Sequence, residues 1–185
     1  MEEKIPLIII ALRIIPKTGL CNFRRNNEFY KAFAFFYTKL LTHLNNSKAC
    51  PEIKQQDNNI IILWDFSEKN IDTLLAEYKK LLSLKRQTNN KFSLCQITYY
   101  LTLEAGFCDI MRLTDTTKAP AYLMQSDMIE RTQKVLSCLD GKKYPSIMLT
   151  HSFYNLLPQY LKQKLPCPYY FFHICCYSIK LPKHS

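Results

Sequence analysis

The chain has 185 residues, of which 48% are apolar and three are glycine, and its formal net charge is +10. This length and composition predict a single folded domain over residues 1–185 and exclude a disordered chain. The scarcity of glycine argues against a glycine-rich phosphate loop, and neither GxGxxG nor GxxxxGKS/T occurs. The excess positive charge favours polyanionic partners such as nucleotides, nucleic acid or acidic membrane surfaces.

The cellular compartment can also be predicted. We expect no secretory signal, because the apolar run over residues 5–15 is interrupted by Arg13 and lacks a cleavage site. No apolar stretch reaches the ~18 residues that a membrane-spanning helix requires. The eight cysteines are scattered through predicted strands and helices, a distribution typical of reduced, buried thiols. We therefore expect a cytoplasmic protein without a membrane span.

The first third of the chain predicts a strand, a helix and a hairpin. Residues 5–15 form an apolar run typical of a buried strand. Residues 27–44 repeat large apolar side chains at three- and four-residue intervals, which indicates a helix. Residues 54–66, KQQDNNIIILWDF, predict a β-hairpin with a turn at Asp57-Asn58-Asn59, because Asp and Asn tolerate the positive φ angles of tight turns.

The middle of the chain predicts a second helix and a second hairpin. The helix is expected from Ser67, as its cap, to about Arg86, and a loop follows over residues 87–91. Residues 92–103 alternate apolar and polar side chains, which indicates a long strand. Glu104-Ala105-Gly106 is expected to turn this strand back into a second one that ends at Leu113.

The last third predicts a helix over residues 126–138, a short strand over 144–149, a helix from Thr150 to Leu161 that Pro158 kinks, and a final strand over 169–181. Residues 119–125 fit no single element. The resulting order, β-α-β-β-α-β-β-α-β-α-β, predicts an α+β protein with an antiparallel or mixed sheet and helices packed on it. Its first half contains the βαββαβ unit of a ferredoxin-like sheet.

This element order resembles the catalytic domain of class III adenylate and guanylate cyclases over nearly the whole chain. KQQDNNIIILWDF is similar to that family's hairpin, which has Gly-Asp at its tip and a strand ending in an aromatic residue. FSLCQITYYLTLEAG resembles the strand that closes in His-Gly or Tyr-Gly. SDMIERTQKVL resembles the start of the Gly-Asp-x-Val-Asn-x-x-x-Arg-Leu helix, and YPSIMLTHSFYNLL the late strand, serine and helix. The resemblance implies a ferredoxin-like core extended as in nucleotide cyclase domains.

The resemblance also implies a two-metal site, in which two aspartates bind the ions that activate the ribose hydroxyl and hold the triphosphate. Asp57 matches the second aspartate. The first falls at Leu12 or Arg13, and no acidic residue occurs between Glu3 and Glu28. An arginine adds positive charge where divalent ions need negative ligands. Asp57 is thus the one predicted metal ligand, and Mg²⁺ or Mn²⁺ is expected only if the domain is active.

Three further positions carry the family's nucleotide-binding roles. The ribose-orienting asparagine aligns with Glu130, the phosphate-binding arginine with Lys134, and the base-reading acid with Ala121. Lys134 can meet a phosphate as a point charge, whereas Glu130 would repel one and Ala121 cannot hydrogen-bond a base edge. The candidate nucleotide-binding residues are therefore Asp57, Arg13, Lys134 and Glu130, with Arg13 contacting phosphate in place of a metal ion.

These departures predict a degenerate cyclase-like domain without cyclase activity, acting as a nucleotide-binding, regulatory or interaction module. Its ligand would be a nucleoside triphosphate or cyclic nucleotide. The resemblance implies a homodimer, because the family's cleft forms between two protomers. Two alternatives remain open. An active, divergent cyclase would need a compensating ligand from Asp109, Asp115 or Asp127. A basic α/β nucleic-acid-binding module would stack bases on aromatic side chains; its candidates are Tyr99, Tyr100, Tyr169, Tyr170, Phe171 and Phe172.

Overall fold

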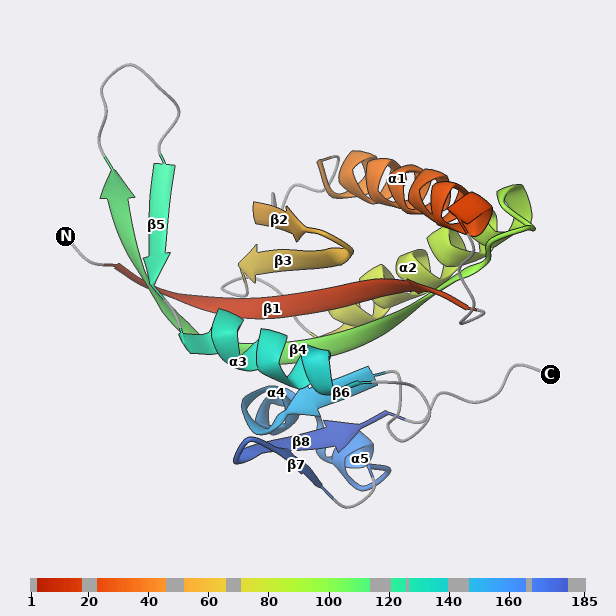
Figure 1. Cartoon of the computed structure of the whole chain (residues 1–185). Coiled ribbons are helices and arrows are strands. Elements are labelled where there is room, and N and C mark those ends of the chain that lie inside the picture. The colour runs from red at the N-terminus through yellow and green to blue at the C-terminus, as the bar shows by residue number, and fades with distance from the viewer. Residues whose placement is uncertain are drawn as a thin grey trace.

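The computed structural model describes residues 3–17, 23–45, 52–65, 71–113, 121–125, 127–139, 147–165 and 168–179. Its elements are β1 (Glu3–Pro16), α1 (Phe23–Asn45), β2 (Glu52–Gln56), β3 (Asn59–Asp65), α2 (Ile71–Lys91), β4 (Ile97–Leu113), β5 (Ala121–Gln125), α3 (Asp127–Cys138), β6 (Ile147–Thr150), α4 (His151–Leu156), α5 (Gln159–Lys162), β7 (Tyr169–Phe171) and β8 (Ile174–Ser178). Figure 1 shows their arrangement around the long strands β1 and β4. The predicted α+β class is confirmed.

The strands form one mixed sheet in the order β2-β3-β1-β4-β6-β8-β7, and β5 extends it by pairing with the far end of β4. β1 is antiparallel to both β3 and β4, whereas β4 and β6 are parallel. The pairing of β1 with β4 extends from Glu3 opposite Ile110 to Pro16 opposite Ile97. These two long apolar strands therefore form the centre of the sheet.

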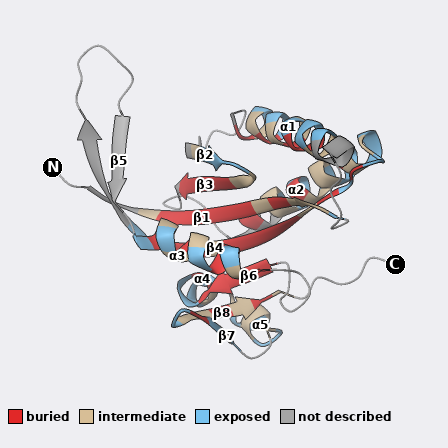
Figure 2. Ribbon diagram, in the orientation of Figure 1, coloured by how far each residue is buried: buried red, intermediate tan, exposed pale blue. Residues whose placement is uncertain are grey.

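Helices cover both faces of the sheet. Successive side chains along a strand point to opposite faces, and the central strands have apolar side chains on both. On one face Ile8, Ile10 and Leu12 of β1 belong to a core that includes buried side chains of α1, α2 and α4. On the other face Ile9 and Ala11 belong to a core with buried side chains of α3. Figure 2 shows that the central strands are buried while the helices expose their outer sides.

The predicted hairpin at Glu104-Ala105-Gly106 is wrong, since β4 continues through these residues as one strand. Ala105 and Gly106 lie opposite Ile8 and Leu7, so β1 supplies a partner along this part of β4 and no turn is needed. Glycine here serves close packing rather than a turn, because a Cβ on Gly106 would lie 2.9 Å from the Met128 sulfur of α3.

The predicted loop over residues 87–91 is also wrong, because α2 continues to Lys91. The hydroxyl of Thr88 donates to the Leu84 carbonyl at 2.8 Å, and the Thr88 side chain is fully buried. The Asn89 amide bonds both backbone groups of Ile97, accepting from its N–H at 2.7 Å and donating to its carbonyl at 3.1 Å. These contacts tie the last turn of α2 to the start of β4.

The final predicted strand is instead the hairpin of β7 and β8. Phe172 and His173 form its turn with φ angles of 47° and 66°, a conformation that usually selects glycine or asparagine.

The predicted kink at Pro158 is an interruption between α4 and α5. Among the helices of the described residues, none has the length and apolar character needed to cross a bilayer.

Candidate functional site

The turn between β2 and β3 lies against the end of β1. Arg13 is opposite Asn59 in the antiparallel register. The Asn58 side-chain amide donates to the Ile14 carbonyl at 2.7 Å, and the Ile14 N–H donates to the Asn58 carbonyl at 2.9 Å. Asp57 adopts a φ of 52°, so the predicted turn is confirmed. The structure thus brings the Arg13 position next to the Asp57 turn.

The guanidinium of Arg13 contacts the last turn of α3. It donates to the Ser137 carbonyl at 3.5 Å and to the Leu139 carbonyl, and it lies 5.5 Å from the centre of the Tyr100 ring. Carbonyls at a helix C-terminus carry partial negative charge and have no partner within the helix, so a cation there is favourable. Arg13 therefore attaches α3 to the sheet.

A polar cavity of about 280 Å³ lies beside this contact. It is lined by Arg13, Gln56, Asn59, Gln133, Leu136 and Ser137. The Arg13 Nε and the Asn59 Oδ1 are buried and hydrogen-bond to no group of the described residues. A buried polar atom without a partner costs about 1–3 kcal/mol. Among the described residues, the lining has one cation, two such atoms and no carboxylate. This lining suits an anion that also carries hydroxyl groups better than it suits a metal ion.

Asp57 is exposed, and within the described part of the chain its carboxylate makes no hydrogen bond or ion pair. No group of three or more His, Cys, Asp or Glu side chains in that part could hold a metal ion. Of the acids considered as compensating ligands, Asp127 is exposed at the start of α3, whereas the side chains of Asp109 and Asp115 are outside the described residues. The described residues thus contribute a single acid at this end of the sheet.

Glu130 and Lys134 form an ion pair on the exposed surface of α3, with 2.6 Å between Oε1 and Nζ. The hydrogen bond and charge of Lys134 lower the pKa of Glu130. Neither residue lines the polar cavity, although their neighbour Gln133 does. Ala121 begins β5. The structure therefore brings Arg13 and the Asp57 turn together, and it leaves the two predicted helix residues paired with each other.

Sequence reasoning missed a buried acid, Glu104, which is 1% exposed on the α3 side of β4. Its Oε2 lies 3.6 Å from the Arg131 Nε, and its Oε1 has no hydrogen-bond partner among the described residues. Burial raises the pKa of Glu104, and Arg131 and the hydroxyls of Thr150 and Ser152 offset only part of that rise. The alternating pattern of β4 was the available signal, but the glycine at 106 suggested a turn instead.

The aromatic residues proposed for base stacking do not form one exposed surface. Tyr99, Tyr100 and Phe171 are buried, whereas Tyr170 and Phe172 are 70% and 67% exposed. Side chains inside the core cannot stack on a base. Three of the six candidates are therefore unavailable for stacking, and the other three, Tyr169, Tyr170 and Phe172, all lie in the β7–β8 hairpin.

An α+β domain with a mixed sheet and helices packed on it is what the resemblance to class III nucleotide cyclases predicted. No protein-family model and no curated protein matches the sequence. Solved structures do match. The adenylyl cyclase CyaB from P. aeruginosa superposes with a TM-score of 0.63 at 11% identity, over 100% of this chain and 98% of that one.

Two guanylyl cyclases show the same similarity. Cya2 superposes with a TM-score of 0.61 at 11% identity, over 99% of this chain and 97% of that one. The guanylate cyclase domain of RhGC from Catenaria anguillulae, in complex with GTP, superposes with a TM-score of 0.55 at 10% identity, over 95% and 96%. The chain has the fold of class III adenylyl and guanylyl cyclase domains, as predicted.

Proposed function

We propose that this chain is a nucleotide-cyclase-like domain that does not cyclise nucleotides and acts as a nucleotide-binding or regulatory module, as a homodimer. One observation carries the proposal: the first metal-binding aspartate is expected at Leu12 or Arg13, neither of which is an acid, and the Arg13 guanidinium is bound to α3. The fold is retained while the charge at the reaction centre is reversed.

Electrostatics support the loss of two-metal chemistry. A divalent cation ~5 Å from a guanidinium is repelled by roughly 7 kcal/mol at an effective dielectric constant of about 20. A lone, exposed carboxylate such as that of Asp57 offers little compensation, because magnesium sites usually combine carboxylates with substrate phosphates in near-octahedral geometry. The usual mechanism uses two ions to hold the attacking and leaving oxygens.

The same cavity has suitable groups for a phosphate without a metal. The buried Nε of Arg13 and the side-chain amides of Gln56 and Gln133 are donors that a phosphate oxygen can accept from. Lys134 follows Gln133 along α3, but its charge is paired with that of Glu130. The ligand of this site would be a nucleoside triphosphate or a cyclic nucleotide, held at its phosphate by Arg13 rather than through an ion.

Isothermal calorimetry with ATP, GTP and their 3′,5′-cyclic products, with and without Mg²⁺, tests this function. We expect at least one nucleotide to bind, with an affinity that Mg²⁺ changes by less than about threefold. Asn59→Asp should weaken binding at least tenfold, because it places a carboxylate of nearly the same shape inside the cavity.

Asn155→Asp is the matched control, since Asn155 is exposed on α4 and does not line the cavity. It should leave nucleotide affinity within about twofold. Binding that occurs only with Mg²⁺ would contradict the metal-free assignment. No heat with any nucleotide would remove the nucleotide-binding half of the proposal and leave the regulatory half.

A further inference from the structure

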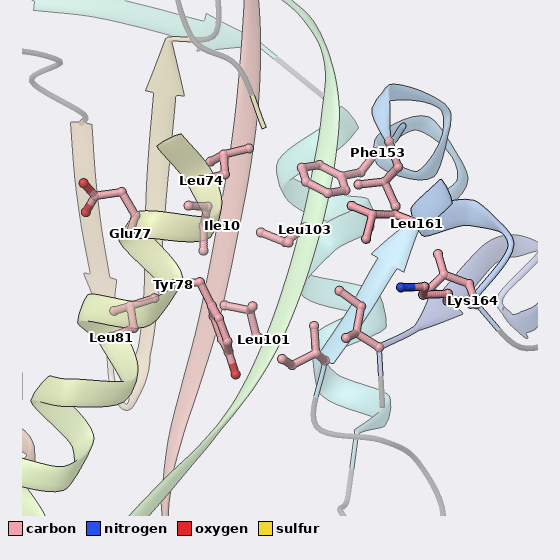
Figure 3. A pocket seen from close by; sticks show the side chains of 14 residues that line it. Ile10, Leu74, Glu77, Tyr78, Leu81, Leu101, Leu103, Phe153, Leu161 and Lys164 are labelled. Carbon is pink, nitrogen blue, oxygen red and sulfur yellow. The ribbon is translucent and has the colours of Figure 1, made fainter. Parts of the chain in front are cut away.

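A second cavity, of about 280 Å³, lies on the sheet face opposite α3. Its floor consists of Ile10, Leu101, Leu103 and Ile147, from the adjacent strands β1, β4 and β6. Helix α2 forms one wall, and the α4–α5 segment forms the other (Figure 3). The cavity is therefore a slot between two groups of helices, with an apolar floor and apolar walls.

The helix arrangement explains this slot. α1 and α2 pack together on one side, and α4 packs over β4, β6 and β8 on the other. Leu81 of α2 and Phe153 of α4 line the two walls. Protein interiors are normally filled to a packing density of about 0.74 and leave few voids larger than a water molecule. An open apolar cavity near the ~300–1,000 Å³ of ligand pockets therefore indicates a binding site.

The two charged side chains that line the cavity, Lys164 and Glu77, point in different directions. Figure 3 shows the Lys164 side chain directed into the cavity and the Glu77 carboxylate directed away from it. Glu77 is occupied elsewhere, since its oxygens lie 2.6 Å from the His43 Nε2 and 3.2 Å from the Lys80 Nζ. Within the described residues, Lys164 has no acidic partner. In the part of the chain that the structure describes, the cavity thus presents one available cation beside an apolar floor.

We propose that this cavity binds a single acyl chain with an anionic headgroup, a long-chain fatty acid, with its carboxylate at Lys164. An apolar tail fits the aliphatic floor, because burying hydrocarbon is favourable by about 0.8 kcal/mol per methylene. The headgroup is anionic, because the Lys164 ammonium is directed into the cavity and residues 151–165 contain no acid. A nucleotide does not fit, because the lining offers too few polar groups to bind a base and a triphosphate.

This inference does not rest on the proposed nucleotide site. The Arg13 cavity lies beside α3, which packs in the core of the opposite sheet face, and the two cavities share no lining residue. Failure of one assignment therefore leaves the other intact.

The test is titration of the full chain with palmitate, read by displacement of a fluorescent fatty acid. We expect saturable binding of one palmitate per chain and at least tenfold weaker binding of hexadecanol, which has the same chain without the charge. Lysophosphatidate is titrated in parallel, because an anionic acyl ligand can be a free fatty acid or a lysolipid. Binding of either anion supports the proposal, and the anion with the higher affinity shows which of the two classes the cavity prefers.

Two variants locate the ligand. Leu103→Trp should reduce palmitate affinity at least tenfold, because Leu103 is only partly buried and a larger ring at this position enters the cavity. Lys164→Glu should reduce it by a similar factor. Lys162→Glu is the matched control: Lys162 lies over the Tyr154 ring, donates to the Asn155 carbonyl and does not line the cavity. The palmitate affinity of Lys162→Glu should differ from that of wild type by less than about twofold.

Thermal unfolding of each variant verifies that it remains folded. The proposal is overturned if the wild type shows no saturable binding of either anion, or binds hexadecanol as tightly as palmitate. It is also overturned if folded Leu103→Trp retains wild-type affinity, or if Lys164→Glu behaves like Lys162→Glu.

Discussion

Replacing Arg13 by alanine is expected to lower the free energy of unfolding by about 2–3 kcal/mol. The substitution removes the hydrogen bonds from the guanidinium to the Ser137 and Leu139 carbonyls. It also removes the cation from the C-terminal end of the α3 dipole and from the Tyr100 ring. Urea unfolding followed by circular dichroism measures this change.

Lys17→Ala is the control for Arg13, because Lys17 is an exposed cation just beyond the same end of β1, where it donates to the Gln96 side chain at 3.2 Å. Surface substitutions of this kind usually change stability by no more than about 0.5 kcal/mol. If the two variants lose equal stability, Arg13 does not hold α3, and its charge has to be explained by a ligand alone.

Replacing Glu104 by glutamine should stabilise the domain at neutral pH by on the order of 1–2 kcal/mol. The pKa of Glu104 is raised above its usual value of 4.5 by burial. An acid with a raised pKa contributes its full stability below its unfolded-state pKa, and that stability is lost as the pH rises through the folded-state pKa. Glutamine has no charge to desolvate, so the variant does not lose this stability as the pH rises above 4.5.

Unfolding in urea between pH 4 and pH 8 tests the Glu104 prediction. The advantage of the variant should be absent at the acidic end and should increase toward neutral pH. Glu130→Gln is the control, because Glu130 is an exposed acid of α3 whose pKa Lys134 lowers. The stability of Glu130→Gln relative to wild type should not increase with pH. A constant difference between Glu104→Gln and wild type across the range would show that Glu104 does not titrate with folding.

The fold could be predicted from the sequence where local pattern and tertiary context agree. The apolar run of β1 and the periodicity of α1 gave the strand and helix that the structure contains. The turn at Asp57 followed from residues that tolerate positive φ. Element order then led to the class III cyclase fold, because the order of strands and helices restricts the possible topologies strongly.

The remainder depends on contacts between distant residues. The turn predicted at Glu104 is wrong because nothing local in the sequence reveals that β1 pairs with β4 from Ile97 to Ile110. The Arg13 contacts join residues 124 and 126 positions apart, so its structural role was not visible. The apolar cavity at Lys164 is lined by residues of six elements, β1, α2, β4, β6, α4 and α5, which are spread over most of the sequence. Residue spacing carries no information on such a cavity.

We infer that this domain retains the cyclase fold without the cyclase reaction. The most direct measurement is mass spectrometry of the products after the protein is incubated with ATP, GTP, CTP and UTP in Mn²⁺. With Arg13 in place of a metal-binding acid, we predict no cyclic nucleotide above the level formed without protein. A cyclic product that disappears in Asp57→Ala would show that the domain is an active cyclase.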